Sequence, residues 1–262
     1  MPSSLIFVSE GFPYDLSSAD EPDLRAVGPL RIEGWFSCLK DYPDRFFVAT
    51  LLGIIRRDAK IGYVGPHCFR IVANHASANE APDVLTVDVN KQLQAGRLTV
   101  LSAPLPNPYV CSSLGLVPKH DGGWRRIYDL FSPRNISVND GIPRDRGALV
   151  YVAVDDAIAA LIAQGCGAML LKEDLADAFW HVSVAISDRW LLGFQWDNVF
   201  YMEDYLPFGL RTAPFLFDIF AKVLHWMLVH LFNWRILLYY LDDFFTVLQS
   251  FTDPALYQQQ WD

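Results

Sequence analysis

The sequence has few charged residues, few cysteines and no excess of basic side chains. Charged residues make up 19% of its 262 positions and hydrophobic residues 52%, which excludes a largely disordered chain and allows a sizeable core. The formal net charge is −9, whereas a free-standing nucleic-acid-binding module is usually basic. A simple binding module is therefore disfavoured, while an enzyme with an acidic site and locally placed cations is not.

The cysteine spacing disfavours a cysteine-based metal site, and the apolar segments disfavour a secreted or a membrane protein. The cysteines lack the paired spacing of metal ligands, which predicts free thiols at Cys38, Cys68, Cys111 and Cys166. The first residues lack the basic start and the long apolar run of a secretory signal peptide. The most apolar stretch, residues 215–241, contains Asp218 and Lys222 and predicts no transmembrane segment. We therefore expect an intracellular protein, cytoplasmic or nuclear, that is not secreted and has no membrane partner.

Apolar periodicity and turn signals predict an α+β chain. Residues 1–40 are acidic and contain several prolines, which predicts an irregular lead-in. The predicted helices run from Pro43 toward Gly62, from Pro82 to Gln94 with Gly96 as a cap, over residues 149–163, and from Pro214 to about Phe232 with Thr212 or Ala213 as N-cap. Between them we expect extended segments over residues 103–118 and two short strands around residues 196–198.

Two adjacent aspartates, Asp242 and Asp243, interrupt an apolar, aromatic run at residues 237–247. Such runs are typical of strands, and a polar pair between them predicts a hairpin turn. Carboxylates held rigidly at a hairpin tip suit a hard cation such as Mg²⁺, although an ordinary Asp-containing turn accounts for the pair equally well. A second pair, Asp155 and Asp156, lies near the start of a predicted helix, where negative charge is favourable without a metal.

A third carboxylate, Asp174, favours a metal site at Asp242 and Asp243 over an ordinary turn. The apolar run at residues 169–171 predicts a strand that ends near Asp174 and is followed by a turn or short helical segment. If this strand lies beside the predicted hairpin, three carboxylates meet in one site.

Two cations, Lys119 and Arg125, flank the Asp-Gly-Gly turn signal at residues 121–123. The pattern predicts a β-hairpin with cations on both arms. It fits a phosphate clamp because the planar fork of arginine binds phosphate oxygens bidentately. A solvated charged hairpin is the alternative.

Four segments, in this order, resemble motifs of reverse transcriptases. The first segment, VPKHDGGWRRIYDL, resembles the fingers hairpin of that family. The next three, DLADAF, LPFGLRTAP and YLDD, resemble its palm motifs. Further segments are most similar to tyrosine-recombinase retrotransposons of the DIRS type: DYPDRFFVATLLGIIRRDAKIGYVGP, FRIVANHASANEAP, SVNDGI and WLLGFQW.

The resemblance implies the α+β right-hand polymerase fold, with fingers, a palm and an antiparallel palm sheet backed by helices. It divides the chain into the lead-in 1–40, N-terminal helices and fingers over 41–167, and a palm over 168–262, with fingers and palm interleaved. Because the chain ends soon after YLDD, the palm is expected to be truncated and the thumb missing.

The resemblance also implies a role for each matching residue. Asp174, Asp242 and Asp243 would be the catalytic and metal-binding carboxylates. The nucleotide would contact Lys119, Arg125, Asp177, Ala178, Phe179, Phe208 and Gly209, and the primer or template would contact Tyr240 and Pro207. An aromatic ring at Phe179 would clash with a ribose 2′-hydroxyl and favour dNTPs, although a core aromatic after a strand is the alternative.

The implied activity is RNA-directed DNA polymerisation, in which a primer 3′-hydroxyl attacks the α-phosphate of a dNTP. The implied cofactor is Mg²⁺, as two ions, with Mn²⁺ as a substitute; two such ions about 3.5–4 Å apart stabilise both ends of an in-line displacement. The implied partners are an RNA or DNA template with a DNA primer, dNTPs, and the thumb, ribonuclease H and recombinase regions of a parent polyprotein.

One residue departs from the family pattern. Glu173 stands where an apolar residue is usual, because that position faces the helices behind the sheet and an unpaired buried carboxylate is costly. This leaves open a catalytically inactive retroelement relic, or a domesticated interaction module for nucleic acid or protein that keeps the fold. A polymerase of the telomerase or RNA-templated RNA type is a third alternative, and Phe179 argues against an RNA product.

Overall fold

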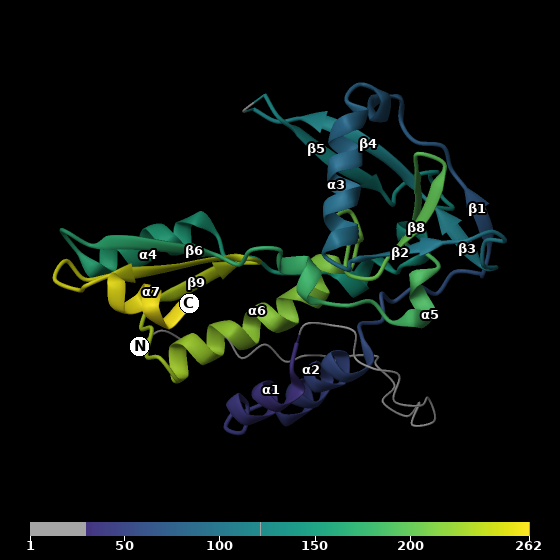
Figure 1. The fold of residues 1–262 in the computed structure, drawn as a ribbon. Coiled ribbons are helices and arrows are strands. Elements are labelled where there is room, and N and C mark those ends of the chain that lie inside the picture. The colour runs from purple at the N-terminus through teal and green to yellow at the C-terminus, as the bar shows by residue number, and fades with distance from the viewer. Residues whose placement is uncertain (1–29, 121, 262) are drawn as a thin grey trace.

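The computed structural model describes residues 30–120 and 122–261. In these residues three sheets and their surrounding helices form two neighbouring parts (Figure 1). One part holds a three-stranded sheet, and the other holds a five-stranded sheet with a two-stranded hairpin beside it.

The three-stranded sheet is antiparallel, with the strand order β6-β10-β9. Its strands are β6 (Met169–Asp174), β9 (Leu237–Tyr240) and β10 (Asp243–Leu248). The helices α4 (Val154–Gln164), α6 (Ala213–His230) and α7 (Ala255–Trp261) lie beside it (Figure 1). The predicted strand ending at Asp174 and the predicted hairpin at residues 237–247 are both confirmed.

The five-stranded sheet is mixed, because β1-β3 and β3-β7 are parallel pairs while the other pairs are antiparallel. Its order is β1 (Phe69–Ile71), β3 (Tyr109–Cys111), β7 (Gly193–Trp196), β8 (Val199–Glu203) and β2 (Leu98–Leu101). The β7-β8 turn has φ of 47° at Asp197 and 60° at Asn198, the left-handed pair that a two-residue hairpin turn requires. Beside this sheet, β4 (Ser113–Pro118) pairs with β5 (Trp124–Asp129).

The remaining helices surround these sheets. They are α1 (Ile32–Cys38), α2 (Arg45–Arg57), α3 (Pro82–Gln94), the one-turn α5 (Ile186–Arg189), and the 3₁₀ helices η1 (Ala76–Asn79), η2 (Asn139–Gly141), η3 (Arg144–Gly147) and η4 (Ala178–His181). A continuous apolar core extends from α2 through β7 and α6 to β10, and Leu51, Phe194 and Phe244 within it are fully buried. This core fixes the two parts against each other.

The predicted helices are found, with shifts at their ends. The Pro82–Gln94 helix is confirmed, and Gly96 follows it with φ 68°. The helix predicted from Pro43 begins later, because Asp44 is its N-cap and accepts a hydrogen bond from the Phe47 N–H at 2.9 Å. It ends at Arg57, where Asp58 has φ 63°, so the predicted end at Gly62 is wrong. The helix predicted over residues 149–163 begins only at Val154.

The irregular lead-in predicted over residues 1–40 is wrong for residues 32–38, which form α1. Residues 1–29 lie outside the described part of the chain. The side chains of Leu30, Ile32 and Trp35 pack against the core, and Trp35 meets Phe220 of α6 edge to face at 5.9 Å. Tertiary packing therefore supports a helix too short to form by local propensity.

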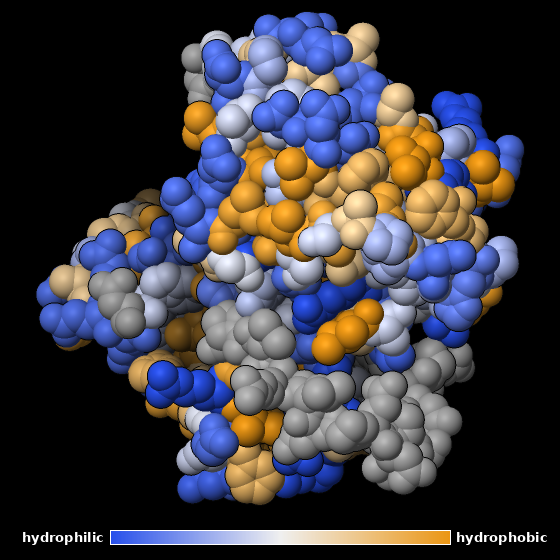
Figure 2. All heavy atoms as spheres, turned by 45° about the vertical axis from the view of Figure 1, so that its right-hand side comes forward, coloured by the Kyte–Doolittle hydropathy of each residue, from blue (hydrophilic) through white to orange (hydrophobic). Residues whose placement is uncertain are grey.

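The surface has an apolar face, and α6 is an apolar helix. Figure 2 shows apolar side chains gathered over the part that holds the five-stranded sheet, where Phe69, Ile71 and Val100 are exposed. By length and composition alone α6 could cross a membrane, but half of it is buried inside the described structure, as in a core helix.

Candidate active site

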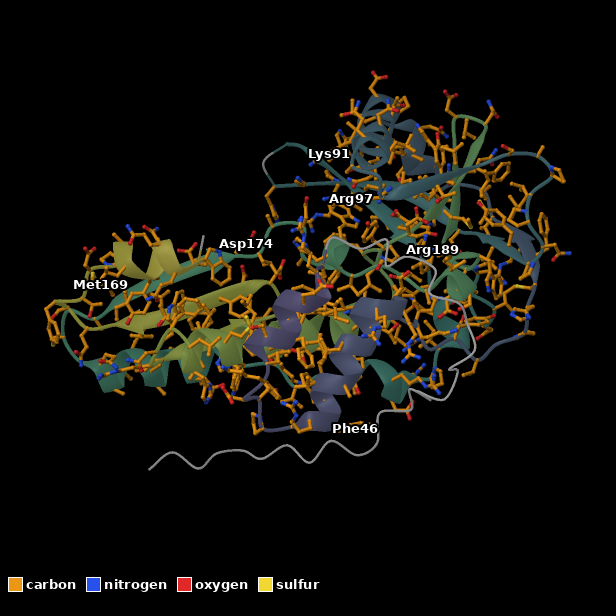
Figure 3. All side chains as sticks on the ribbon, turned by 60° about the horizontal axis from the view of Figure 1, so that its bottom comes forward. Phe46, Lys91, Arg97, Met169, Asp174 and Arg189 are labelled. Carbon is orange, nitrogen blue, oxygen red and sulfur yellow. The ribbon has the colours of Figure 1, made fainter. Side chains whose placement is uncertain are left out.

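The register of the three-stranded sheet brings the predicted carboxylates together. Asp243, the first residue of β10, lies directly opposite Asp174, the last residue of β6. Directly opposite residues of antiparallel strands have Cα atoms only about 4.5–5.5 Å apart. Asp242 forms the adjoining turn, and its carbonyl accepts a hydrogen bond from the Leu175 N–H at 2.9 Å. Asp174 and Asp243 therefore face each other at the end of β6 nearest the five-stranded part, with Asp242 in the turn beside them (Figures 1 and 3).

The two faces of this sheet have opposite characters. Residues directly opposite share a face, so Lys172, Asp174 and Asp243 lie on one side. Glu173, Phe244 and Tyr239 lie on the other. The Tyr239 hydroxyl donates to Asp218 of α6 at 3.2 Å, so this second side faces the helix. As predicted, Glu173 points toward the helices, and its Oε1 is buried without a hydrogen-bond partner in the described structure.

Like charges directly opposite in a sheet repel each other. Burial raises the pKa of Asp242, and the carboxylates of Asp174 and Asp243 raise it further. The positive charge of Lys172 opposes this effect, and its ammonium group donates to Asp243 Oδ1 at 2.8 Å. This hydrogen bond raises the pKa of Lys172. The site is thus an acidic cluster that holds one internal countercharge.

The donor set fits hard divalent cations, because all three side chains supply carboxylate oxygens. Burial is the main cause of the raised pKa of Asp242, and the neighbouring Asp174 and Asp243 carboxylates add to it, so a bound cation would lower that pKa. Within the described residues, no group of three or more His, Cys, Asp or Glu side chains is already arranged to bind a metal. Asp174, Asp242 and Asp243 would be the residues that hold one.

Beside the carboxylates lies an aromatic cluster that contains part of the predicted nucleotide-binding set. Asp177, Ala178 and Phe179 form the start of η4, immediately after the Asp174 strand. The Phe179 ring lies 4.9 Å from that of Phe208 and 5.7 Å from that of Phe217 in α6. Phe179 is 8% exposed and Phe208 59%, so Phe208 presents the accessible aromatic surface.

Gly209 follows Phe208 in a conformation that requires glycine. Its φ is 94°, and a Cβ there would lie 2.5 Å from the Tyr128 carbonyl oxygen. The Gly209 carbonyl accepts a hydrogen bond from the Asn139 side chain at 2.8 Å. The loop therefore packs closely against β5. The absence of a side chain at Gly209 lets the loop approach the backbone of Tyr128.

The predicted cationic hairpin is present as β4 and β5. Arg125 lies on β5 opposite Val117, and Lys119 follows the end of β4; both residues are exposed. The hairpin extends toward the side on which the three-stranded sheet lies (Figure 1). Both cations are therefore accessible to a ligand from solvent.

The two residues predicted to contact primer or template lie in different settings. Tyr240 ends β9, is 47% exposed, and has its ring 4.6 Å from that of Tyr151. Pro207, which precedes Phe208 in the same loop, is buried. Tyr240 is thus available for contact, whereas Pro207 shapes the loop.

Sequence reasoning missed Lys172, Arg97 and Asn139. Lys172 could have been found from strand periodicity, because it lies two residues before Asp174 and so shares its face. Arg97, which pairs with Asp177, and Asn139, which holds the Gly209 loop, come from distant segments that carry no local signal.

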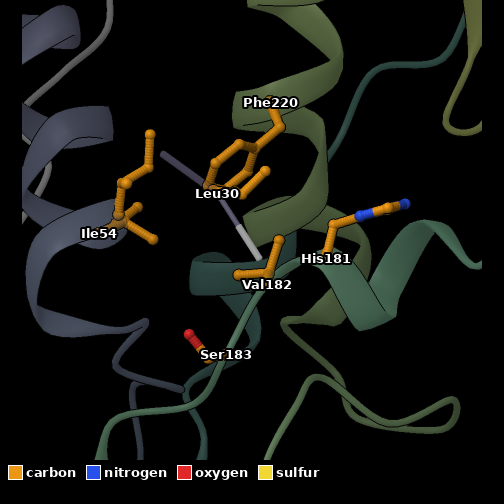
Figure 4. Close-up of a pocket in the computed structure, with 7 residues that line it drawn as sticks. Leu30, Ile54, His181, Val182, Ser183 and Phe220 are labelled. Carbon is orange, nitrogen blue, oxygen red and sulfur yellow. The ribbon is translucent and has the colours of Figure 1, made fainter. Parts of the chain in front are cut away.

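A small pocket lies elsewhere, between α2, α6 and the segment after η4 (Figure 4). It is lined by Leu30, Ile54, Ile55, His181, Val182, Ser183 and Phe220. Its cavity volume of about 10 Å³ is close to the minimum for a single water molecule, so it is no substrate site.

Several solved structures have a fold similar to that of this chain. The prototype foamy virus protease-reverse transcriptase CSH mutant matches with TM-score 0.55 and 20% identity, over 90% of this chain and 31% of that one. The foamy viral protease-reverse transcriptase in complex with RNA/DNA hybrid matches with TM-score 0.56 and 18% identity, over 88% and 31%. The same protein in complex with dsDNA matches with TM-score 0.52 and 18% identity, over 91% and 50%. The chain therefore spans half or less of the length of these relatives.

Sequence comparison supplies the family. A search of curated proteins finds no match. The family model described as reverse transcriptase (RNA-dependent DNA polymerase) matches residues 117–256, which is more than half of the chain and includes the carboxylates, the Phe208 loop and Arg125. This protein therefore belongs to the reverse transcriptase family and has the α+β fold of its fingers and palm.

Proposed function

We propose that this chain is the fingers-and-palm region of an RNA-directed DNA polymerase from a retrotransposon, with residues 41–167 and 168–262 contributing its interleaved fingers and palm. The observation that carries the proposal is the register of Asp174 against Asp243, with Asp242 in the adjoining turn. Neighbouring strands would thereby present two carboxylates on one face, with the third in the turn beside them. The DIRS-type origin rests on the sequence segments that resemble those elements.

Bound divalent ions, Mg²⁺ or Mn²⁺, would supply charge stabilisation to the attacking and leaving oxygens of a phosphoryl transfer. The chain's own groups would position the reactants. Lys119 and Arg125, on an accessible hairpin, would contact the triphosphate. Phe208 would lie against the nucleotide, and Phe179 beneath it would select against a 2′-hydroxyl. Tyr240 would contact the primer, whose RNA or DNA template completes the substrate.

Primer extension tests the proposal. A DNA primer annealed to an RNA template is incubated with dNTPs and Mg²⁺, and the chain is compared with Asp242→Asn. Loss of a direct metal ligand should lower the rate by at least about a hundredfold, because even partners behind the ligands contribute tenfold to a hundredfold. Asp155→Asn is the matched control, since it neutralises one member of an exposed aspartate pair in α4.

Extension by the wild type and by Asp155→Asn, but not by Asp242→Asn, supports catalysis. Extension by the wild type no greater than that of Asp242→Asn overturns it for this chain. Retained binding of the RNA/DNA hybrid without extension would instead support the non-catalytic module.

A further inference from the structure

Arg97 connects the two parts of the molecule. It lies between α3 and β2, just after Gly96, whose φ of 68° ends the helix. The Arg97 N–H donates to the Gln92 carbonyl at 3.0 Å, and the Arg97 carbonyl accepts from the Asp204 N–H at 3.0 Å. Both backbone groups are thus fixed, and from this position the side chain reaches Asp177 and Trp180.

The guanidinium group of Arg97 makes three contacts. One amino group donates to the Gln92 side-chain oxygen at 3.0 Å, and the other donates to Asp177 Oδ2 at 2.5 Å. Its central carbon lies 4.2 Å from the centre of the Trp180 ring, within the range of a cation–π contact. The Arg97 side chain is 16% exposed and that of Asp177 is 42% exposed, so the guanidinium group is largely covered while the carboxylate remains accessible to solvent.

The residue that Arg97 holds has an unusual backbone. Asp177 has φ 58° and ψ 29°, a left-handed conformation that is uncommon for any residue other than glycine. Its carbonyl accepts from the Trp180 N–H at 2.8 Å, which closes the turn of η4. Arg97 therefore contacts both ends of this turn, Asp177 by an ion pair and Trp180 by stacking.

The same turn carries the proposed nucleotide contacts. Between Asp177 and Trp180 lie Ala178 and Phe179, and the Trp180 ring meets Phe208 edge to face at 6.0 Å. A displacement of the turn would move Phe179 and Phe208 together, because they pack on each other. The positive charge of Arg97 also offsets an Asp177 carboxylate that would otherwise repel a polyanionic ligand.

We infer that Arg97 is a positioning residue for the nucleotide site, acting through Asp177 and Trp180 to set the affinity for dNTPs and the discrimination against rNTPs. The inference rests on the proposed polymerase function. Arg97 lies outside residues 117–256, the region that matches the family model, whereas the turn that it contacts lies inside that region.

Two kinds of variant separate positioning from a merely structural role. Arg97→Met removes the ion pair and the stacking, whereas Arg97→Lys keeps the charge but loses the planar fork. Lys91→Met is the matched control, because it removes one positive charge from an exposed site on α3 (Figure 3). Thermal unfolding identifies any variant that fails to fold.

Steady-state primer extension is measured with dTTP and UTP as competing nucleotides. Arg97→Met should raise the KM for dTTP about tenfold, change kcat by less than about threefold, and lower the preference for dTTP over UTP. Arg97→Lys should restore part of this loss. Combining Arg97→Met with Asp177→Asn should cost no more than Arg97→Met alone, because both changes disrupt one interaction.

A second readout does not depend on turnover. The stabilisation of the chain by dTTP with Mg²⁺, without primer, is measured by thermal shift and should be smaller for Arg97→Met than for Lys91→Met. If the wild type extends primers but Arg97→Met matches Lys91→Met in KM, selectivity and thermal shift, the inference is wrong and the proposed function stands. If the wild type neither extends primers nor responds to dTTP, both are wrong.

Discussion

Residues 172 to 174 place charged groups on both faces of strand β6. Alternation along β6 places Lys172 and Asp174 on the acidic face and Glu173 on the face toward α6. A single polar run therefore contributes a metal-type ligand, a countercharge and a buried carboxylate oxygen without a partner.

Glu173→Leu should stabilise the protein. Its Oε1 is buried and unpartnered in the described structure, and its cross-strand neighbour Phe244 is fully buried. Because an unsatisfied buried polar group costs roughly 1–3 kcal/mol, we expect a gain of about 1 kcal/mol in the free energy of urea unfolding. The exposed Glu33→Leu serves as a control and should give no such gain. A destabilised Glu173→Leu would show that this carboxylate has a favourable role.

Lys172→Met should strengthen the binding of divalent cations. Lys172 is the cation that pairs with Asp243 in the described structure, and a metal ion must compete with it. Its removal should lower the Kd for Mn²⁺, measured by calorimetry, severalfold at low salt and less at high salt. Lys222→Met is the control, because its partner Asp218 lies outside the carboxylate cluster. An unchanged or raised Kd would contradict the competition.

At the scale of elements, α6 determines how firmly the hairpin that carries Asp242 and Asp243 is held. His225 of this helix donates from Nε2 to the Leu237 carbonyl of β9 at 3.0 Å, and its ring lies 5.3 Å from that of Tyr239. Burial lowers the pKa of His225 below its ordinary value of about 6.5. This contact makes the attachment of the helix to the sheet sensitive to pH.

The sign of that sensitivity follows from linkage. Because the folded pKa lies below the unfolded one, the unfolded chain takes up the proton first as the pH falls. The contribution of His225 to stability is therefore complete above about pH 6.5 and is lost from there downward. His225→Gln should flatten the fall in unfolding free energy between pH 7.5 and pH 5.5. His120→Gln, at an exposed position after β4, should leave that fall unchanged.

At the scale of the whole molecule, a buried ion cluster joins segments far apart in the sequence. Arg189 donates to Asp204 at 2.9 Å, to Asp58 at 3.4 Å and to the Val184 carbonyl at 2.7 Å. Ser183 donates to Asp58 and Thr99 donates to Asp204, which completes the cluster. It connects the end of α2, the segment around α5, the end of β8 and strand β2.

Arg189→Met should be strongly destabilising. It leaves the buried Asp58 and Asp204 carboxylates without their cation, and breaking a buried pair costs about 3–5 kcal/mol. Urea unfolding should show that loss, whereas the exposed Arg57→Met should change stability little. A loss below about 1 kcal/mol would mean that the cluster contributes specificity and not stability.

The sequence by itself determined the elements whose cause is local. The Pro82 start and Gly96 end of α3, the aromatic runs around Asp242 and the Asp-Gly-Gly turn each act through neighbouring residues, so their patterns predicted helices and strands correctly. The order of four motifs also predicted the family. Element ends such as Asp44 and Asp58, and the helix α1, were missed because caps and tertiary packing decide them.

Only the tertiary structure decided which of these segments meet. The register that sets Asp174 against Asp243 depends on the pairing of strands nearly seventy residues apart. The contact of Arg97 with Asp177 depends on how the two parts of the molecule dock. Composition and periodicity describe what each segment buries, but such long-range contacts arise from packing one buried face against another, which no local pattern encodes.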